Sequence, residues 1–118
     1  MPSYRVQRTN EDVMRELTAL LREMKDPRVA NAMLTIVKVD LASDLTSCKV
    51  YVSSLNGLED TKKAVGALKN AAGFLRRELG RRIEMRHTPE LRFFADDSIA
   101  HSADIARILN DLEREGKV

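Results

Sequence analysis

The sequence predicts an α+β domain in which a small, mixed, three-stranded sheet carries helices on one face and leaves the other face exposed. Its 118 residues suffice for one hydrophobic core, so we expect a single domain over residues 1–118, with residues 1–8 flexible and residues 114–118 frayed. Apolar residues recur at helical spacing before residue 27 and after residue 58. Between them lie two β-branched stretches joined by a turn, which indicate a hairpin.

The first predicted helix begins near Thr9-Asn10, because either side chain can cap a helix. It ends at Asp26-Pro27, because the residue before a proline avoids helical dihedral angles. The helix has one apolar stripe, formed by Val13, Leu17, Leu20, Leu21 and Met24.

Two strands follow, at residues 34–40 and 47–53, and the turn chemistry of Ser43-Asp44 between them favours a hairpin. Side chains alternate along a strand, so Lys49 and Tyr51 are expected on one face of the second strand. Its other face is apolar and carries Cys48, Val50 and Val52.

A long helical segment follows Asn56-Gly57, with Asp60 or Thr61 as its predicted cap. Opposite its apolar face, glycines recur every seven residues, at 66, 73 and 80, with basic side chains beside them. An interior glycine costs roughly 1 kcal/mol relative to alanine, so the glycine stripe is expected either to serve binding or to allow tight packing on the sheet. The apolar face consists of Ala64, Val65, Leu68, Ala71, Ala72, Leu75 and Leu79.

An unbroken helix would place Phe74 near its polar side and Arg82 in its apolar arc. A break across Ala71-Ala72-Gly73 would relieve both conflicts, so we predict two helices that meet at Gly73, the second running to about Ile83. Small side chains at such a break let a sugar–phosphate backbone come close, and the N-terminus of the second helix offers N–H groups to phosphate.

Thr88-Pro89 ends this region, and residues 91–95 are predicted to form a third strand. Asp96-Asp97-Ser98 or Ser102 then caps a last, C-terminal helix. The apolar residues expected on that helix are Ile105, Ile108, Leu109 and Leu112.

The net charge of +2 hides a strongly basic central segment. Residues 62–92 hold nine Lys or Arg against three Glu, a net charge of +6, whereas the remainder of the 20 basic and 18 acidic residues gives −4. This asymmetry indicates a polyanionic partner such as RNA. The predicted phosphate-binding residues are Lys69, Arg76, Arg77, Arg81, Arg82 and Arg86.

The sequence indicates a binding module without a catalytic constellation. The single cysteine, Cys48, excludes an internal disulfide framework, and no histidine lies near it to activate a nucleophile. His87 and His101 lack ligand-like spacing, so no metal or other cofactor is expected. Without a signal peptide or an apolar run of about 20 residues, the chain is expected to be cytoplasmic and to bind no membrane.

Several motifs, in their order and spacing, resemble bacterial ribosome-binding factor A. The resemblance implies a type II K-homology fold of α-β-β-α-α-β order, in which an Ala-x-Gly kink replaces the GxxG loop of ordinary K-homology domains. Ala71 and Gly73 match that kink. The motifs are Lys25-Asp26-Pro27-Arg28, Lys49-Val50-Tyr51-Val52-Ser53, Ala71-Ala72-Gly73-Phe74-Leu75-Arg76, Pro89-Glu90-Leu91, Phe93 and Asp96.

The resemblance also implies a function: binding to the free 30S subunit, contact with 16S rRNA, and support for late 30S maturation, especially in the cold. The family is associated with processing of the 16S rRNA 5′ end without being the nuclease. We expect a monomer that takes no small-molecule substrate. The chain ends at Val118, so contacts made by the longer charged tails of some members are not transferred to it.

Three alternatives remain open at this point. The basic helical face could dock an acidic protein partner, which would make the chain an adaptor. Asp96 or His87 could serve an RNA-processing nuclease, although a helix cap explains Asp96 more simply. Tyr51 and Phe94 could stack a base on the open sheet face or could simply pack across strands.

Overall fold

The computed structural model describes residues 4–83, 85, 87–98 and 107–109. Its elements follow the order helix, strand, strand, helix, helix, strand, with one short additional helix before the first strand. The predicted α+β class is therefore confirmed. The elements are α1 (Tyr4–Glu23), α2 (Pro27–Ala30), β1 (Leu34–Leu41), β2 (Ser47–Ser54), α3 (Leu58–Asn70), α4 (Ala72–Arg82) and β3 (Glu90–Ala95).

The sheet is mixed and has the strand order β1-β2-β3. β1 and β2 pair antiparallel as the predicted hairpin, whereas β2 and β3 run parallel and are joined through α3 and α4. The register of β1 shifts at Val37, which is an extra residue between Ile36 and Lys38. Because of this bulge, Ile36 and Val39 both face the core although they are three residues apart.

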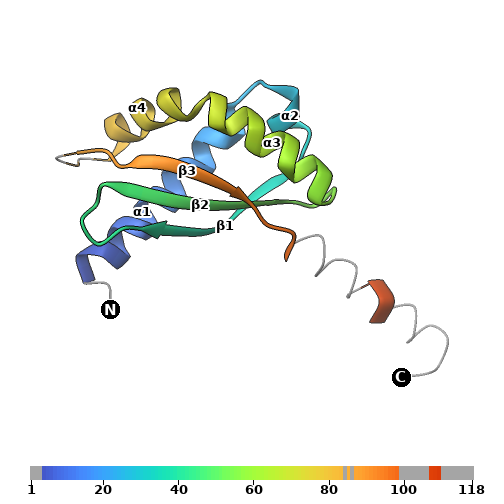
Figure 1. Cartoon of the computed structure of the whole chain (residues 1–118), viewed down its shortest axis with the longest axis horizontal. Coiled ribbons are helices and arrows are strands. Elements are labelled where there is room, and N and C mark those ends of the chain that lie inside the picture. Colours follow the sequence, from blue (N-terminus) through green and yellow to red (C-terminus); the bar gives the residue numbers. More distant parts are fainter. Residues whose placement is uncertain (1–3, 84, 86, 99–106, 110–118) are drawn as a thin grey trace.

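One face of the sheet is covered by α1, α3 and α4, and the other is open, as predicted. Figure 1 shows α3 and α4 along the β3 side of the sheet and α1 passing behind the strands. The alternation predicted for β2 is also confirmed, because Lys49 is exposed and Tyr51 half-buried. The apolar strand residues that are buried are Ile36, Val39, Leu41, Cys48, Val50, Val52, Leu91 and Phe93.

The start of α1 differs from the prediction. The helix begins at Tyr4, not near Thr9-Asn10. Asn10 lies within it, and its side-chain oxygen accepts a hydrogen bond from the Leu41 backbone N–H at 2.9 Å, which fastens the end of β1 to α1. The capping side chain is thus used for a tertiary contact. The predicted apolar stripe is confirmed, since its residues are buried or, for Met24, packed against the core.

The predicted stop at Asp26-Pro27 also starts the short helix α2, which the sequence analysis did not foresee. The Asp26 carboxylate accepts a hydrogen bond from the Arg28 backbone N–H at 2.9 Å, and Pro27 occupies the first helical position. Hydrogen bonds from the Arg28 side chain and backbone hold the pKa of Asp26 below its ordinary value.

The cap of α3 was predicted wrongly. The helix begins at Leu58, and Gly57, with φ of +113°, occupies the N-cap position. Asp60 and Thr61 therefore lie in the first helical turns. Thr61 is buried, and its hydroxyl donates to the Gly57 carbonyl and accepts from the Ser54 backbone N–H, both at 2.9 Å. This residue ties α3 to the end of β2.

β3 spans the predicted third strand and begins one residue earlier, at Glu90. After it, the Asp96 carboxylate accepts a hydrogen bond from the Ser98 backbone N–H at 2.7 Å. Hydrogen bonding by the Ser98 side chain and backbone lowers the pKa of Asp96. Of the predicted last helix, residues 107–109 are helical, and Ile108 and Leu109 are exposed. The remainder of that prediction, including Ser102, Ile105 and Leu112, falls outside the described residues.

Candidate nucleic-acid interface

The break between α3 and α4 lies at Ala71, within the predicted segment Ala71-Ala72-Gly73 but two residues before Gly73, where the helices were expected to meet. Ala71 has φ of −93° and ψ of 2°, and its N–H donates to the carbonyls of Ala67 and Leu68, each at 3.1 Å. The carbonyl of Ala71 accepts a hydrogen bond from the backbone N–H of Leu75 at 2.9 Å. The last bonds of α3 and the first bond of α4 therefore meet at one half-buried alanine, and no side chain caps the start of α4.

The small residues at the break lie in two environments, the hydrophobic core and the protein surface. Ala71 and Ala72 pack against the hydrophobic core, where larger side chains would push the helices apart. Gly73 lies in the first turn of α4 and is exposed. The break does not bury Phe74, which remains 49% exposed, so the expected relief of that conflict was wrong.

Arg77 lies one helical turn after Gly73 and extends its guanidinium back over it. A Cβ atom placed on Gly73 would lie 4.0 Å from a terminal nitrogen of Arg77. Arg77 and Lys69 are exposed, and neither forms an ion pair with a carboxylate of any described residue. These two cations flank the break, Lys69 before it and Arg77 after it, and are available to an external anion.

Arg81 and Arg76 are exposed but have partners. Arg81 forms an ion pair with Glu78 at 3.2 Å while its side chain stays 77% exposed, so the pair is weak and easily exchanged. The Arg76 Nε donates to the Thr88 carbonyl at 3.0 Å, and its side chain lines a hollow that also contains Asp12 and Asp44. Arg76 is thus partly engaged by the backbone of Thr88.

Arg82 has a different role from its predicted neighbours. One terminal nitrogen lies 2.9 Å from the Glu23 carboxylate and the other 3.9 Å from Glu16, and both acids belong to α1. The side chain is 29% exposed. Arg82 thus joins α4 to α1, and its charge is compensated within the protein. Arg86, the remaining predicted cation, lies outside the described residues.

The glycine stripe divides into two kinds of site. A Cβ atom on Gly80 would lie 2.5 Å from the Thr88 hydroxyl oxygen, so glycine is needed there for close packing. A Cβ atom on Gly66 would have no atom within 4 Å, and one on Gly73 would make only ordinary contact. Packing therefore explains why residue 80 is glycine. It does not explain the absence of a side chain at Gly66 and Gly73.

The open sheet face carries the aromatic pair that the sequence analysis singled out. Tyr51 and Phe94 are stacked, with ring centroids 5.4 Å apart and 25° between their planes. The Lys38 ammonium lies 5.9 Å from the centroid of Tyr51. Cross-strand packing is thus present. Lys38 could not be predicted from the sequence, because the bulge at Val37 sets which β1 residue faces Tyr51.

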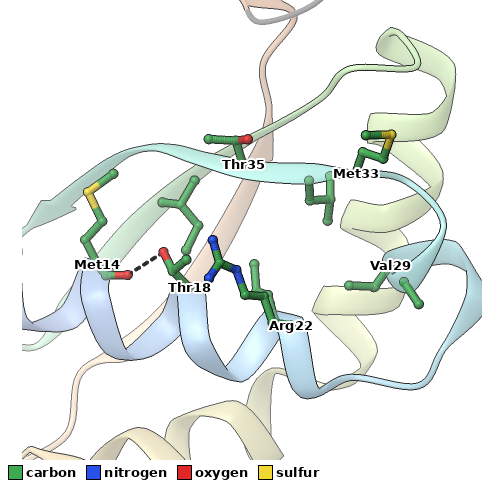
Figure 2. A pocket seen from close by; sticks show the side chains of 10 residues that line it. Met14, Thr18, Arg22, Val29, Met33 and Thr35 are labelled. Atoms are coloured by element: carbon green, nitrogen blue, oxygen red, sulfur yellow. Dashed lines mark hydrogen bonds between the residues drawn. The ribbon is translucent and has the colours of Figure 1, made fainter.

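A second hollow, of about 440 Å³, lies between α1, α2 and β1 (Figure 2). Met14 and Met33 form part of its apolar wall, Arg22 reaches into it, and the Thr18 hydroxyl donates to the Met14 carbonyl at 2.7 Å. Among its described lining residues there is no carboxylate, histidine or cysteine, so this hollow offers no acid–base or nucleophilic chemistry.

The remaining reactive side chains are not arranged for catalysis. Burial, with a smaller contribution from the charge of Asp40, raises the pKa of Cys48 to about 12, so its thiol stays protonated. His87 and Asp96 lie beyond opposite ends of β3, separated by a strand of about 20 Å, and cannot act on one bond. Among the described residues no three His, Cys, Asp or Glu side chains gather in a way that could hold a metal ion.

None of the helices in the described part of the chain has the length and apolar character needed to cross a membrane.

Comparison with known families finds a match to the family described as ribosome-binding factor A, over residues 5–109. Ribosome-binding factor A of Desulfitobacterium hafniense is 42% identical over 116 residues, covering 98% of this chain and 91% of the relative. The factor of Acetivibrio thermocellus is 39% identical over 114 residues, covering 96% of this chain and 92% of the relative.

Solved structures give the same result. The crystal structure of ribosome-binding factor A from Thermus thermophilus aligns with a TM-score of 0.68 at 30% identity, covering 76% of this chain and 93% of that one. A homology model of the Thermus thermophilus factor, fitted into an electron cryomicroscopy map of a 30S complex with that factor, aligns with a TM-score of 0.56 at 29% identity. It covers 78% of this chain and 91% of that one.

Proposed function

This chain belongs to the ribosome-binding factor A family, and on that premise we propose that it binds the free 30S subunit through 16S rRNA and assists late 30S maturation. Members of the family are binding factors, and the chain is not an enzyme. Cleavage at the 16S rRNA 5′ end is then performed by a separate nuclease while this chain is bound. It acts as a cytoplasmic monomer, and its contribution is greatest in the cold. The Thermus thermophilus relative fitted into a 30S complex supports the choice of subunit.

The observation that carries the proposal is the exposed surface around the α3–α4 break. We define the basic face as Lys69, Arg77 and Arg81 together with the exposed backbone at Gly73. Lys69 and Arg77 are not paired with any carboxylate in the described part of the chain. Gly73 has no packing reason to lack a side chain. A surface with unpaired cations and bare backbone suits a phosphate chain that approaches closely.

Binding of this kind depends on phosphates more than on sequence. Each cation that meets a phosphate releases counterions from the RNA, and this release supplies affinity without reading bases. Arg81 can exchange Glu78 for a phosphate at small cost, because the ion pair is exposed. Arg82 is left out of the contact set, because Glu16 and Glu23 already compensate its charge. Arg86 stays a prediction from the sequence.

Gradient sedimentation of cell extracts tests the proposal. The wild-type chain is expected to migrate with free 30S subunits and not with translating ribosomes. A double charge reversal, Arg77→Glu with Arg81→Glu, is expected to move most of the protein to the top of the gradient. Arg15→Glu is the control for the single reversal Arg77→Glu, since Arg15 is an exposed arginine of α1 paired with Asp12. This control is expected to stay with 30S subunits.

Two outcomes would contradict the proposal. Retention of the charge-reversed variant on 30S subunits would place the contact elsewhere on the molecule. Treatment with ribonuclease separates RNA binding from the adaptor alternative, in which the basic face docks an acidic protein. A complex that survives complete RNA digestion would favour the adaptor.

A further inference from the structure

β1 is the edge strand of the sheet on the side away from β3. In an antiparallel pair, residues of every second pair direct their N–H and C=O groups away from the partner strand. Leu34 belongs to such a pair, because its partner Ser54 donates its own N–H to the Thr61 hydroxyl. Leu41, near the other end of β1, gives its outward N–H to Asn10 of α1. At Leu34 no described residue of α1 or α2 takes this role, so this end of the edge is open to another strand.

The hollow of about 440 Å³ between α1, α2 and β1 lies beside this open end of the edge (Figure 2). Leu34, Thr35 and Ile36 of β1 line it. The helices contribute further apolar lining, including the buried side chains of Leu21 and Val29. A strand that pairs with β1 at this point directs every second side chain toward the helices, and so into the hollow.

Met33, which lines the hollow just before β1, combines an unusual backbone with an exposed side chain. Its φ of 51° lies in the left-handed region, which residues other than glycine rarely adopt. Its apolar side chain is 61% exposed, so packing within the protein does not account for a long side chain at this position. Methionine is common on surfaces that bind apolar segments, because its side chain is flexible and polarizable. Met14 supplies a second methionine to the same hollow.

The hollow also contains one uncompensated cation. Arg22 is the only charged side chain among the described residues that line it, and it reaches into the hollow (Figure 2). The acids nearest to it along the chain have other partners, since Glu23 pairs with Arg82 and Asp26 with Arg28, each at 2.9 Å. No ion pair joins Arg22 to a carboxylate of a described residue. An apolar segment that carries a carboxylate complements this surface.

An adjoining hollow, of about 520 Å³, extends the site along α1. It shares Met14, Thr18 and Arg22 with the first hollow. Glu11 is the only carboxylate among its described lining residues, and it lies about 16 Å before Arg22 along the helix axis. We call the two hollows together the α1–β1 groove. Because the groove is elongated, it suits an extended segment better than a compact small molecule.

We propose that the α1–β1 groove binds an extended segment of a protein partner. The segment adds a strand to the open end of β1, places an apolar side chain in the hollow and pairs a carboxylate with Arg22. In strand addition, main-chain hydrogen bonds supply affinity, and pockets for alternate side chains supply specificity. α3 and α4 lie on the β3 side of the sheet, so a protein segment at β1 and RNA at the basic face can be bound together (Figure 1). The inference does not depend on the proposed function.

A defined panel of labelled peptides tests the proposal with the purified full chain. Each peptide has seven residues, with threonine at the odd positions and leucine, glutamate or lysine at the even ones. The varied side chains therefore lie on one face of a strand. Fluorescence anisotropy is expected to show binding of peptides with leucine and glutamate, and not of those with lysine in place of glutamate. Methylation of the peptide backbone nitrogens is expected to abolish binding, because it removes the strand hydrogen bonds.

Charge reversal at the groove provides the sharpest arm of the test. Arg22→Glu is expected to weaken binding of the leucine–glutamate peptides about tenfold or more and to favour their leucine–lysine counterparts. Arg92→Glu is the matched control, since Arg92 is an exposed arginine of β3, at the opposite edge of the sheet. It is expected to keep the wild-type preference. Failure of the whole panel to bind, or an unchanged preference in Arg22→Glu, would overturn the proposal.

A second variant keeps the test independent of any loss of folding. Met33→Gly removes part of the apolar wall and places at residue 33 the amino acid that adopts a positive φ most readily. It is expected to keep the thermal stability of the wild type and to bind the peptides about tenfold more weakly. Peptide binding as tight as that of the wild type would contradict the role of Met33 and of the hollow.

Two further outcomes would assign the groove or the peptide elsewhere. Light scattering that detects a dimer, lost in Arg22→Glu, would give the groove to a second copy of the chain and overturn the proposal. The Arg77/Arg81 charge reversal is expected to bind the peptides as the wild type does. Loss of peptide binding in that variant would place the acidic peptides on the basic face, which would also overturn the proposal. Neither outcome affects sedimentation of the wild-type chain with 30S subunits, so the proposed function is tested separately.

Discussion

At the scale of single residues, the three glycines show how far sequence periodicity can be interpreted. Their spacing of seven predicts one stripe on an unbroken helix, whereas the segment is divided into two helices at Ala71. It does not separate Gly80, which is close to Thr88, from Gly66 and Gly73, which are open. That distinction depends on a neighbour that the chain brings back after the end of α4, and no local pattern contains it.

Replacing these glycines by alanine separates packing from binding. Gly73→Ala is expected to raise the free energy of unfolding by up to about 1 kcal/mol, because alanine is the better helix former and meets no clash. It is also expected to weaken 30S binding, because the methyl group holds the RNA backbone away. Gly80→Ala is expected to lower the free energy of unfolding, because Thr88 must move.

Thermal or urea unfolding combined with gradient sedimentation checks both variants. A Gly73→Ala protein that is more stable and binds 30S subunits as tightly as wild type would remove the close-approach role of Gly73. The same measurements on Gly80→Ala serve as the comparison in which stability, and not contact with RNA, is affected.

At the scale of elements, the helix break across Ala71-Ala72-Gly73 could be predicted from residue phase, and the structure places it at Ala71. The conflict involving Phe74 and Arg82 correctly indicated two helices in place of one. The structure resolves the conflict at Arg82 by ion pairs with α1 and leaves Phe74 exposed. Glu16 and Glu23 are far from Arg82 in the sequence, so this pairing depends on tertiary structure.

Arg82 is accordingly expected to behave as a structural residue. Arg82→Gln should lower the free energy of unfolding by about 1 kcal/mol, since each partly exposed ion pair contributes about 0–1 kcal/mol. It should leave the affinity for 30S subunits nearly unchanged. Arg81→Gln should weaken the affinity for 30S subunits and leave the free energy of unfolding nearly unchanged, because Arg81 is 77% exposed and belongs to the basic face.

Urea unfolding and a 30S binding titration on the two glutamine variants decide the matter. A larger loss of 30S affinity in Arg82→Gln than in Arg81→Gln would return Arg82 to the binding surface. A double-mutant cycle with Glu23→Gln would show whether the loss of stability comes from the ion pair.

At the scale of the whole molecule, the order of elements and the covered and open faces of the sheet were predictable from sequence. The hairpin followed from β-branched alternation, and the core of β2 followed from Cys48, Val50 and Val52. Three features were not predictable: the bulge at Val37, the start of α1 at Tyr4 and the short helix α2. Each depends either on contacts between distant segments or on a local sequence that is compatible with more than one backbone conformation.

The sequence predicts which residue types form the candidate site, but only part of how their side chains are arranged. Charge asymmetry directs the prediction to the basic residues between 62 and 92. Which of them are available follows from their neighbours: carboxylates compensate Arg82, whereas Lys69 and Arg77 lack such a partner among the described residues. The central claim is that these available cations bind RNA through its phosphates.

The salt dependence of binding to 30S subunits tests this claim most directly. The logarithm of the association constant is expected to fall steeply and linearly with the logarithm of salt concentration. Each of Arg77→Gln and Arg81→Gln should reduce that slope by about 0.7–0.9, the value for one lost phosphate contact. A nearly flat plot for the wild type, or slopes that the two substitutions leave unchanged, would contradict the account.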